Sequence, residues 1–131
     1  MLFVGTDIVE IARIRNAARR HSGFWEKVLS PQERKLCLEK KDPIPSLAGR
    51  FAAKEAVLKC LGTGLRGISW QDMEILPDDR GCPQVYFTEK MKKILRTHGL
   101  QTIKVSVSHS RDYATAVAVG EGWPNENRNR E

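Results

Sequence analysis

The sequence predicts an α+β fold in which helices pack on one side of a mainly antiparallel sheet. Two observations lead to this prediction. Segments with the alternation or β-rich composition of strands stand near both ends of the chain and in its middle, and segments with helical periodicity lie between them. The two kinds of segment do not alternate strictly, as they would in a parallel βαβ fold.

The first predicted elements are an apolar, β-rich strand over residues 2–8 and a basic helix after it. The apolar side of that helix is formed by Ile11, Ile14 and Ala18. Its arginines point away from that side, so we expect a helix with one face on the core and a basic face in solvent.

Two further helices are predicted from their start signals. Ser30 can cap a helix that has Pro31 at its first position and Glu33 in a capping box, and this helix should run to about residue 40. Ser46 is then expected to cap a helix over residues 47–61, which the segment Gly62-Thr63-Gly64 ends.

The second half of the chain is predicted to hold two strand pairs and one helix. These are strands 73–76 and 84–87 joined by a turn over 77–81, a helix over 89–98 capped by Thr88, and a hairpin of strands 102–108 and 113–119. Residues 1–120 should form a single domain, and the polar tail 121–131 is expected to be disordered.

Composition narrows the class of protein. The chain has 131 residues, a net charge of +6 and a sequence pI near 9.5. It has no apolar run of the roughly 20 residues that a membrane helix needs, and its N-terminus lacks the features of a signal peptide, so a cytoplasmic protein without membrane contact is expected. Three cysteines without CxxC spacing argue against a disulfide framework or a zinc site.

The basic charge leaves the kind of partner open. A positive balance favours phosphate-rich or carboxylate-rich partners, such as nucleic acid, a phosphorylated small molecule or an acidic protein. The alternative is a solvated basic surface without a specific partner.

The helix predicted over residues 47–61 has two distinct faces. Its core stripe is predicted to be Leu47, Phe51, Leu58 and Leu61. Another face carries Glu55 and Lys59 beside the small residues Ala48, Ala52 and Ala56, which would let something approach the helix closely. The alternative is an ordinary surface ion pair between Glu55 and Lys59.

Three further polar residues stand in unusual places. Asp7 interrupts an apolar strand, where a carboxylate needs a partner or a metal ion, unless it simply caps the next helix. Lys54 projects close to the core stripe and either extends to solvent or reaches a bound anion. His109 at a strand end is either a base or phosphate contact, or only structural. Nothing positions a catalytic triad around its neighbouring serines, so a hydrolase is rejected.

Three motifs follow one another along the chain: residues 5–11 (GTDIVEI) with Arg13, residues 50–56 (RFAAKEA) with Lys59 and GTG at 62–64, and residues 107–110 (VSHS) followed by Tyr113-Ala114. Together they resemble the holo-acyl-carrier-protein synthases, the short bacterial members of the 4′-phosphopantetheinyl transferase superfamily. Their order and spacing match, and the resemblance covers about residues 1–119.

The resemblance implies an α+β homotrimer with its active sites at subunit interfaces. The activity would transfer 4′-phosphopantetheine from coenzyme A to a serine of an acidic acyl carrier protein, releasing 3′,5′-ADP, in fatty acid biosynthesis. Asp7 and Glu55 would bind Mg²⁺, with Mn²⁺ as the alternative, and Lys59 would lie near the pyrophosphate. Arg13 would belong to the docking surface for the carrier protein. The implied coenzyme A contacts are Arg50, Lys54, Gly62, Gly64, Gly81, Pro83, Ser108 and His109.

Two matters stay open at this level. The family commonly has Gly-Lys-Pro where this chain has Gly81-Cys82-Pro83, so a basic contact to the nucleotide phosphates is lost or comes from elsewhere, with Arg80 as one candidate. The proton of the carrier serine could pass to Glu55, to His109 or to a metal-bound hydroxide. Glu55, Lys59 and His109 are the predicted catalytic residues.

Two rival functions have different signatures. A basic nucleic-acid-binding module would fit the charge, but aromatic residues make up only 7% of the chain, and no RRM, KH or zinc-finger pattern occurs. A non-catalytic coenzyme A-binding scaffold would not need Asp7, Glu55 and Lys59 together. The sequence leaves open which carrier protein is served and whether acyl-coenzyme A is accepted.

Overall fold

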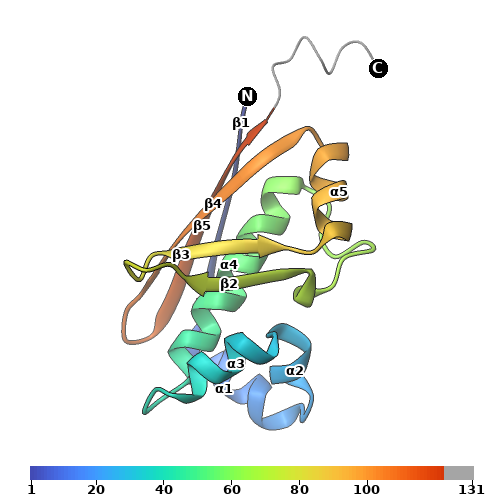
Figure 1. Cartoon of the computed structure of the whole chain (residues 1–131). Helices are drawn as coiled ribbons and strands as arrows, with labels where there is room; N and C mark the ends of the chain where they lie inside the picture. Colours follow the sequence, from blue (N-terminus) through green and yellow to red (C-terminus); the bar gives the residue numbers. More distant parts are fainter. Residues whose placement is uncertain (123–131) are drawn as a thin grey trace.

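The protein is described here by a computed structural model, which describes residues 1–122 (Figure 1). The chain order of its elements is β1 (Leu2–Glu10), α1 (Ile11–Arg20), α2 (Phe24–Val28), α3 (Pro31–Leu38), α4 (Ile44–Leu61), the 3₁₀ turn η1 (Trp70–Asp72), β2 (Met73–Pro77), β3 (Pro83–Phe87), α5 (Glu89–Thr97), β4 (Leu100–His109) and β5 (Tyr113–Gly122). The predicted α+β class is confirmed.

The strands form two antiparallel sheets. The larger sheet has the order β1-β5-β4, and the smaller one is the hairpin β2-β3. In the larger sheet Asp7 pairs with Ala116 and His109 pairs with Ala114, so Asp7 and His109 lie on opposite outer strands, flanking neighbouring positions of the central strand. The register of one sheet thus fixes the positions of Asp7 and His109 relative to each other.

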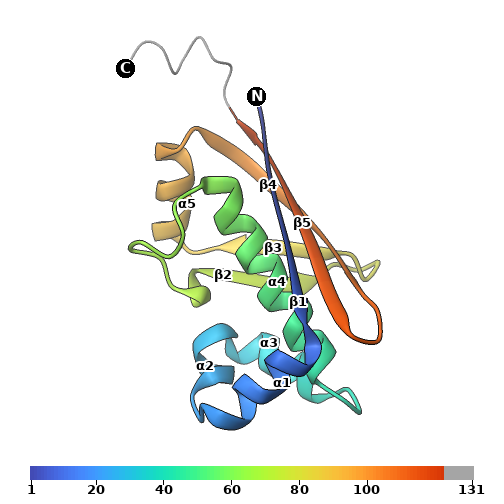
Figure 2. The ribbon, with the colours of Figure 1, turned by 180° about the vertical axis from the view of Figure 1, so that it is seen from behind.

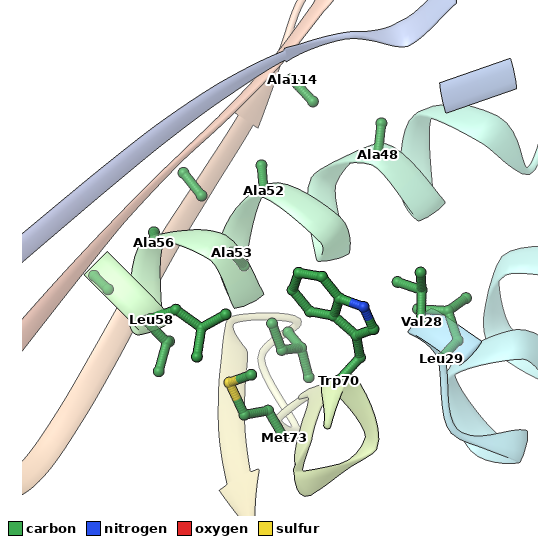
Figure 3. Packing of buried hydrophobic residues seen from close by; sticks show 14 of the residues in the cluster. Val28, Leu29, Ala48, Ala52, Ala53, Ala56, Leu58, Trp70, Met73 and Ala114 are labelled. Atoms are coloured by element: carbon green, nitrogen blue, oxygen red, sulfur yellow. The ribbon is translucent and has the colours of Figure 1, made fainter. Parts of the chain in front are cut away.

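Helix α4 lies between the larger sheet and the β2-β3 hairpin, as the two opposite views show (Figures 1 and 2). Its alanines Ala48, Ala52 and Ala56 point towards the strands, while Trp70 and Met73 lie on its other side (Figure 3). Because small residues let a helix approach a sheet closely, the alanine face is occupied by the protein's own sheet. The close approach expected at these alanines is therefore made by the protein's own sheet.

Helices α1, α2 and α3 gather around the N-terminal half of α4 (Figures 1 and 2). The capping box predicted for α3 is present, with the Ser30 hydroxyl accepting from the Glu33 amide and the Glu33 carboxylate accepting from the Ser30 amide. The predicted cap of α5 is also confirmed, because the Thr88 hydroxyl accepts from the Met91 amide.

The structure differs from the prediction at several boundaries. Helix α4 begins at Ile44, where the Asp42 carboxylate accepts from the helix amide, so Ser46 is an interior residue and not its cap. Strand β5 continues to Gly122, two residues into the predicted tail. The rest of that tail, 123–131, lies outside the described residues. Helix α2 and the turn η1 were not predicted.

Two expectations from composition can be compared with the described residues. Within residues 1–122, no helix combines the length and the apolar character needed to cross a membrane. The three cysteines Cys37, Cys60 and Cys82 are all free thiols, as expected.

Candidate active site

The approach of β1 to α4 is set by Gly5. A Cβ atom at this position would lie 2.1 Å from the Ala56 carbonyl oxygen and 2.7 Å from the Cys60 amide nitrogen. No residue larger than glycine fits at that distance, so the strand backbone lies directly on the helix. Asp7, two residues further along and on the same side of the strand, is thereby held against the helix face that carries Glu55 and Lys59.

The Asp7 carboxylate is only half satisfied. Its Oδ1 accepts from the Lys59 ammonium at 3.1 Å, while its Oδ2 is buried and has no hydrogen-bond partner. The Asp7 side chain is 14% exposed. Because a buried carboxylate oxygen without a partner is costly, this atom marks a position for a further ligand.

Glu55 completes a pair of carboxylates beside Lys59. Its pKa is raised above the ordinary carboxyl value, first by burial and second by the negative charge of Asp7, while Lys59 opposes the shift. The Lys59 ammonium of α4 forms an ion pair with Asp7 of strand β1. The simple surface pair between Glu55 and Lys59 is therefore not the arrangement that forms.

These residues fit a magnesium ion. Mg²⁺ typically takes one or two protein carboxylates and fills its other positions with water and substrate phosphates. Asp7 offers an oxygen without a partner, and Glu55 adds a second carboxylate, whose pKa is raised by burial and by the nearby charge of Asp7. No group of three or more metal-ligating side chains occurs among residues 1–122, so a complete all-protein cage is not what the chain builds there.

A pocket of about 700 Å³ lies at the other end of α4. It brings together four of the predicted coenzyme A contacts, which are Arg50, Gly81, Pro83 and His109. The Gly81 backbone has a positive φ of 84°, which a glycine adopts freely, and the Asp78 carboxylate accepts from the Cys82 amide to hold this turn.

Other lining residues of this pocket were not predicted. They include Lys40, Asp42, Ser46, Gly49, Pro77 and Val107. The exposed Lys40 supplies a positive charge at the rim, the role for which the sequence suggested Arg80. Arg80 does not line the pocket, and Cys82 next to it is exposed. The loop that carries Lys40 and Asp42 has no sequence signature of its own, since its position follows from the packing of α3 against α4.

Lys54 does not reach this pocket. Its side chain is fully buried, and its ammonium donates to the Glu33 carboxylate and to the Val28 carbonyl oxygen, both at 2.7 Å. A ligand could be contacted only by breaking both bonds and taking the ammonium away from the buried Glu33 carboxylate, which is costly. The structure therefore corrects the expectation that Lys54 extends to solvent or binds coenzyme A.

The remaining predicted ligand contacts lie outside the pocket. Gly62 ends α4 in the left-handed conformation with φ of 75°, and Gly64 has φ of 65°. Ser108 is exposed and pairs with Thr115 on the outer face of the larger sheet. None of the three lines the pocket that holds Arg50 and His109.

Arg13 lies on the exposed side of α1, with its side chain 82% exposed and its Nε 4.0 Å from the Glu10 carboxylate. A second pocket of about 330 Å³ opens beside it. The apolar part of its lining comes from Ile8, Val9, Ile14, Phe51 and Tyr113. A basic residue at the edge of an apolar hollow is the arrangement expected of a surface that receives another protein.

The carboxylate pair and the large pocket are separate regions of one chain. None of Asp7, Glu55 and Lys59 lines that pocket. Arg50 and Glu55 are five residues apart on α4, which places them about 140° apart around the helix axis. A single chain therefore presents two separate groups of predicted site residues on different sides of the same helix. The carboxylate half-site holds Asp7, Glu55 and Lys59, and the pocket half-site holds Arg50 and His109.

Comparison with known proteins defines the class. The model of the 4′-phosphopantetheinyl transferase superfamily matches residues 3–118. A holo-[acyl-carrier-protein] synthase of Caldanaerobacter subterraneus subsp. tengcongensis is 46% identical over 124 residues, which cover 95% of this chain and 98% of the relative. The chain belongs to the holo-[acyl-carrier-protein] synthase family of these transferases.

Solved structures agree with this assignment. The holo-[acyl-carrier-protein] synthase of Neisseria meningitidis superposes with a TM-score of 0.83 at 35% identity, covering 91% of this chain and 97% of that one. The Helicobacter pylori enzyme, solved in complex with coenzyme A, has a TM-score of 0.79 at 34% identity, covering 90% and 99%.

Proposed function

We propose that this chain transfers 4′-phosphopantetheine from coenzyme A to a serine of apo-acyl carrier protein, giving the holo-protein and 3′,5′-ADP. The observation that carries the proposal is the buried, unpartnered Oδ2 of Asp7 beside Glu55 and Lys59. Structural relatives include a family member bound to coenzyme A. Such transfers need positioning and charge neutralisation more than covalent help from the protein.

The two half-sites would bind different parts of coenzyme A. Arg50, His109 and the rim residue Lys40 offer positive or hydrogen-bonding groups for the nucleotide phosphates in the large pocket. Lys59 places a fixed positive charge at the carboxylate half-site, where negative charge on the pyrophosphate develops. Magnesium, held there by Asp7 and Glu55, would supply further charge neutralisation and orientation of the pyrophosphate.

The carrier serine must lose its proton, and Glu55 and His109 are the side chains proposed to accept it. The serine oxygen would attack the β-phosphorus of coenzyme A, the bond from that phosphorus to the ADP oxygen would break, and 3′,5′-ADP would leave.

The outer face of the larger sheet supports assembly of the chain into a homotrimer. On this face Val4 pairs with Val119 and Thr6 pairs with Val117, while Leu2 and Ile8 are 74% and 62% exposed. An apolar sheet face of this kind is typical of an interface between subunits. Packing of neighbouring chains on it would bring the carboxylate half-site of one chain to the pocket half-site of the next.

The acidic carrier protein would dock on α1. The exposed Arg13 and the apolar pocket beside it offer both a charge and a hollow for a helix with acidic and apolar side chains. Arg13→Glu should raise the apparent KM for the carrier, and more so at low salt, because salt screens exposed charges. An unchanged KM at low salt would remove Arg13 from the docking surface.

The transfer itself is tested by intact-mass spectrometry. Purified protein is incubated with coenzyme A, Mg²⁺ and an apo-acyl carrier protein, with an EDTA control. The expected result is a phosphopantetheine-sized mass gain on the carrier that EDTA prevents. Folded protein that modifies none of several apo-carriers would favour the coenzyme A-binding scaffold instead. The carrier of fatty acid biosynthesis is the proposed substrate, Mg²⁺ or Mn²⁺ the proposed ion, and the cytoplasm the proposed location.

A further inference from the structure

An ion cluster is buried directly behind the large pocket. Glu33 and Lys54 are both fully buried, and their charged groups are 2.7 Å apart. The Arg50 guanidinium lies at the edge of this cluster, with its Nε 3.8 Å from the second Glu33 oxygen. Two cations thus share one carboxylate, and only Arg50 among the three lines the pocket.

The Glu33 carboxylate joins three elements of the pocket wall. Its Oε1 accepts from the Ser30 amide at the start of α3 and from Lys54 of α4. Its Oε2 accepts from the Ile75 amide of β2 at 3.0 Å. Residues of α3, α4 and β2 all line the pocket, so one buried group fixes the relative positions of its walls.

Arg50 is held by the same arrangement. Its Nε donates to the Ile75 carbonyl oxygen at 3.1 Å, and its Nη1 donates to the Ser46 hydroxyl at 2.5 Å. Its side chain is 14% exposed, which leaves one edge of the guanidinium towards the pocket. Glu33 therefore acts on Arg50 in two ways. It acts directly through its charge, and indirectly through the backbone of Ile75, whose amide donates to Glu33 and whose carbonyl oxygen accepts from Arg50.

Rigid placement of a guanidinium matters for phosphate binding. A guanidinium binds phosphate through a planar fork of donors, and its contribution depends on orientation. A binding group whose rotamer is fixed by a second layer of hydrogen bonds loses less entropy when the ligand arrives. Without Glu33, Arg50 would keep its bond to Ser46 but lose its ion partner, and the Ile75 amide would lose its acceptor.

We propose that Glu33 is a positioning residue for coenzyme A binding, which orients Arg50 towards the phosphates of the nucleotide. Glu33 touches no part of the pocket itself and acts only through Arg50 and the wall that carries it. This proposal rests on the proposed function, because it assumes that the large pocket receives coenzyme A.

The test is a double-mutant cycle read by titration calorimetry with coenzyme A. Arg50→Ala should raise the Kd roughly ten- to a hundredfold, as expected for hydrogen bonds between charged groups. Glu33→Gln alone should raise it roughly five- to thirtyfold. In the Arg50→Ala background, Glu33→Gln should change the Kd by less than about twofold, because its effect passes through Arg50.

Two further variants separate positioning from folding. Glu33→Gln combined with Lys54→Met removes both buried charges and is expected to stay folded, since a buried ion pair replaced by groups of similar shape is often tolerated. It should show the same loss of coenzyme A affinity as Glu33→Gln. Glu74→Gln is the matched control, because Glu74 accepts from the Ser30 hydroxyl in the same region and makes neither a hydrogen bond nor an ion pair with Arg50, so the Kd of this variant should stay at the wild-type value.

Kinetics give an independent readout. Glu33→Gln should raise the KM for coenzyme A, with the KM for the carrier protein unchanged. A folded Glu33→Gln or Glu33→Gln/Lys54→Met variant with wild-type affinity, or an undiminished effect of Glu33→Gln without Arg50, would overturn the positioning role alone. Wild-type protein that fails to bind coenzyme A would overturn the proposed function, and the positioning role with it.

Discussion

Replacement of Gly5 by alanine tests how the carboxylate half-site is built. The added methyl group would lie 2.1 Å from the Ala56 carbonyl oxygen, on the backbone of α4. The Ala56 oxygen and the Cys60 amide nitrogen, which would lie 2.7 Å away, are both backbone atoms, so no side-chain rotation can relieve the contact. Strand β1 must move away from the helix, and Asp7 must move with it relative to Glu55.

The size of the effect follows from the geometry. Ordinary contacts of a Cβ atom begin near 3.4 Å, and contacts below 3.0 Å are essentially never seen, so the strand must retreat by about 1 Å. Overpacking of this kind typically costs about 1–3 kcal/mol. At roughly 3–5 °C per kcal/mol for a chain of this size, Tm should fall by about 3–15 °C. A misplacement of about 1 Å at a reacting centre can reduce turnover by roughly a hundredfold.

The assay combines thermal unfolding by circular dichroism with the carrier-modification rate below Tm. Gly23→Ala is the matched control, because a Cβ atom there meets nothing within 4 Å and the Gly23 φ of −94° suits any residue. It should leave both Tm and turnover near wild type. Gly5→Ala protein with wild-type Tm and turnover would refute the claim that close packing of β1 on α4 sets the site.

Three further predictions concern single charged side chains. Lys54→Met leaves Glu33 buried without its ammonium partner and should lower the free energy of unfolding by about 3–5 kcal/mol in a urea titration, whereas a loss under about 1 kcal/mol would contradict a buried ion pair. Glu55→Gln should raise the Tm of the metal-free protein at neutral pH. The folded pKa of Glu55 is raised, so ionising it costs stability above that pKa and nothing well below its ordinary value of 4.5, and the Tm difference should vanish in acid. An equal difference at both pH values would show that charge is not the cause. Lys59→Met should tighten Mn²⁺ binding roughly three- to tenfold, measured by electron paramagnetic resonance, because a competing cation leaves Asp7, while turnover falls. Weaker Mn²⁺ binding would mean that Lys59 supports the ion site.

Much of the fold was predictable because local signals determined it. The capping box of α3, the Thr88 cap and the alternation of β4 each depend on residues close in sequence. The site motifs were also found from sequence. Asp7 and Glu55 are 48 residues apart in the sequence. Each was nevertheless predicted as a site residue, Asp7 because it is a polar residue in an apolar strand and Glu55 because it is a carboxylate on an alanine-rich helix face.

What the sequence did not predict depends on tertiary packing. Lys54 was expected at a ligand or in solvent because its partner Glu33 lies 21 positions away, on another helix. The alanine face of α4 was expected to let something approach closely, but only tertiary packing shows that strand β1 makes this approach through Gly5. Ser46 carried a cap signal, but the helix begins at Ile44, whose amide donates to the Asp42 carboxylate, and Ser46 lies inside the helix and accepts from Arg50.

We propose that one active site combines the carboxylate half-site of one chain with the pocket half-site of its neighbour in a trimer. Asp7→Ala and His109→Ala variants would each be assayed alone and after equal mixing by co-expression. Each variant alone should be nearly inactive. In mixed trimers an intact site needs Asp7 from one chain and His109 from the next, so about a quarter of wild-type turnover should return. Mixed protein no more active than the separate variants would contradict a site shared between chains.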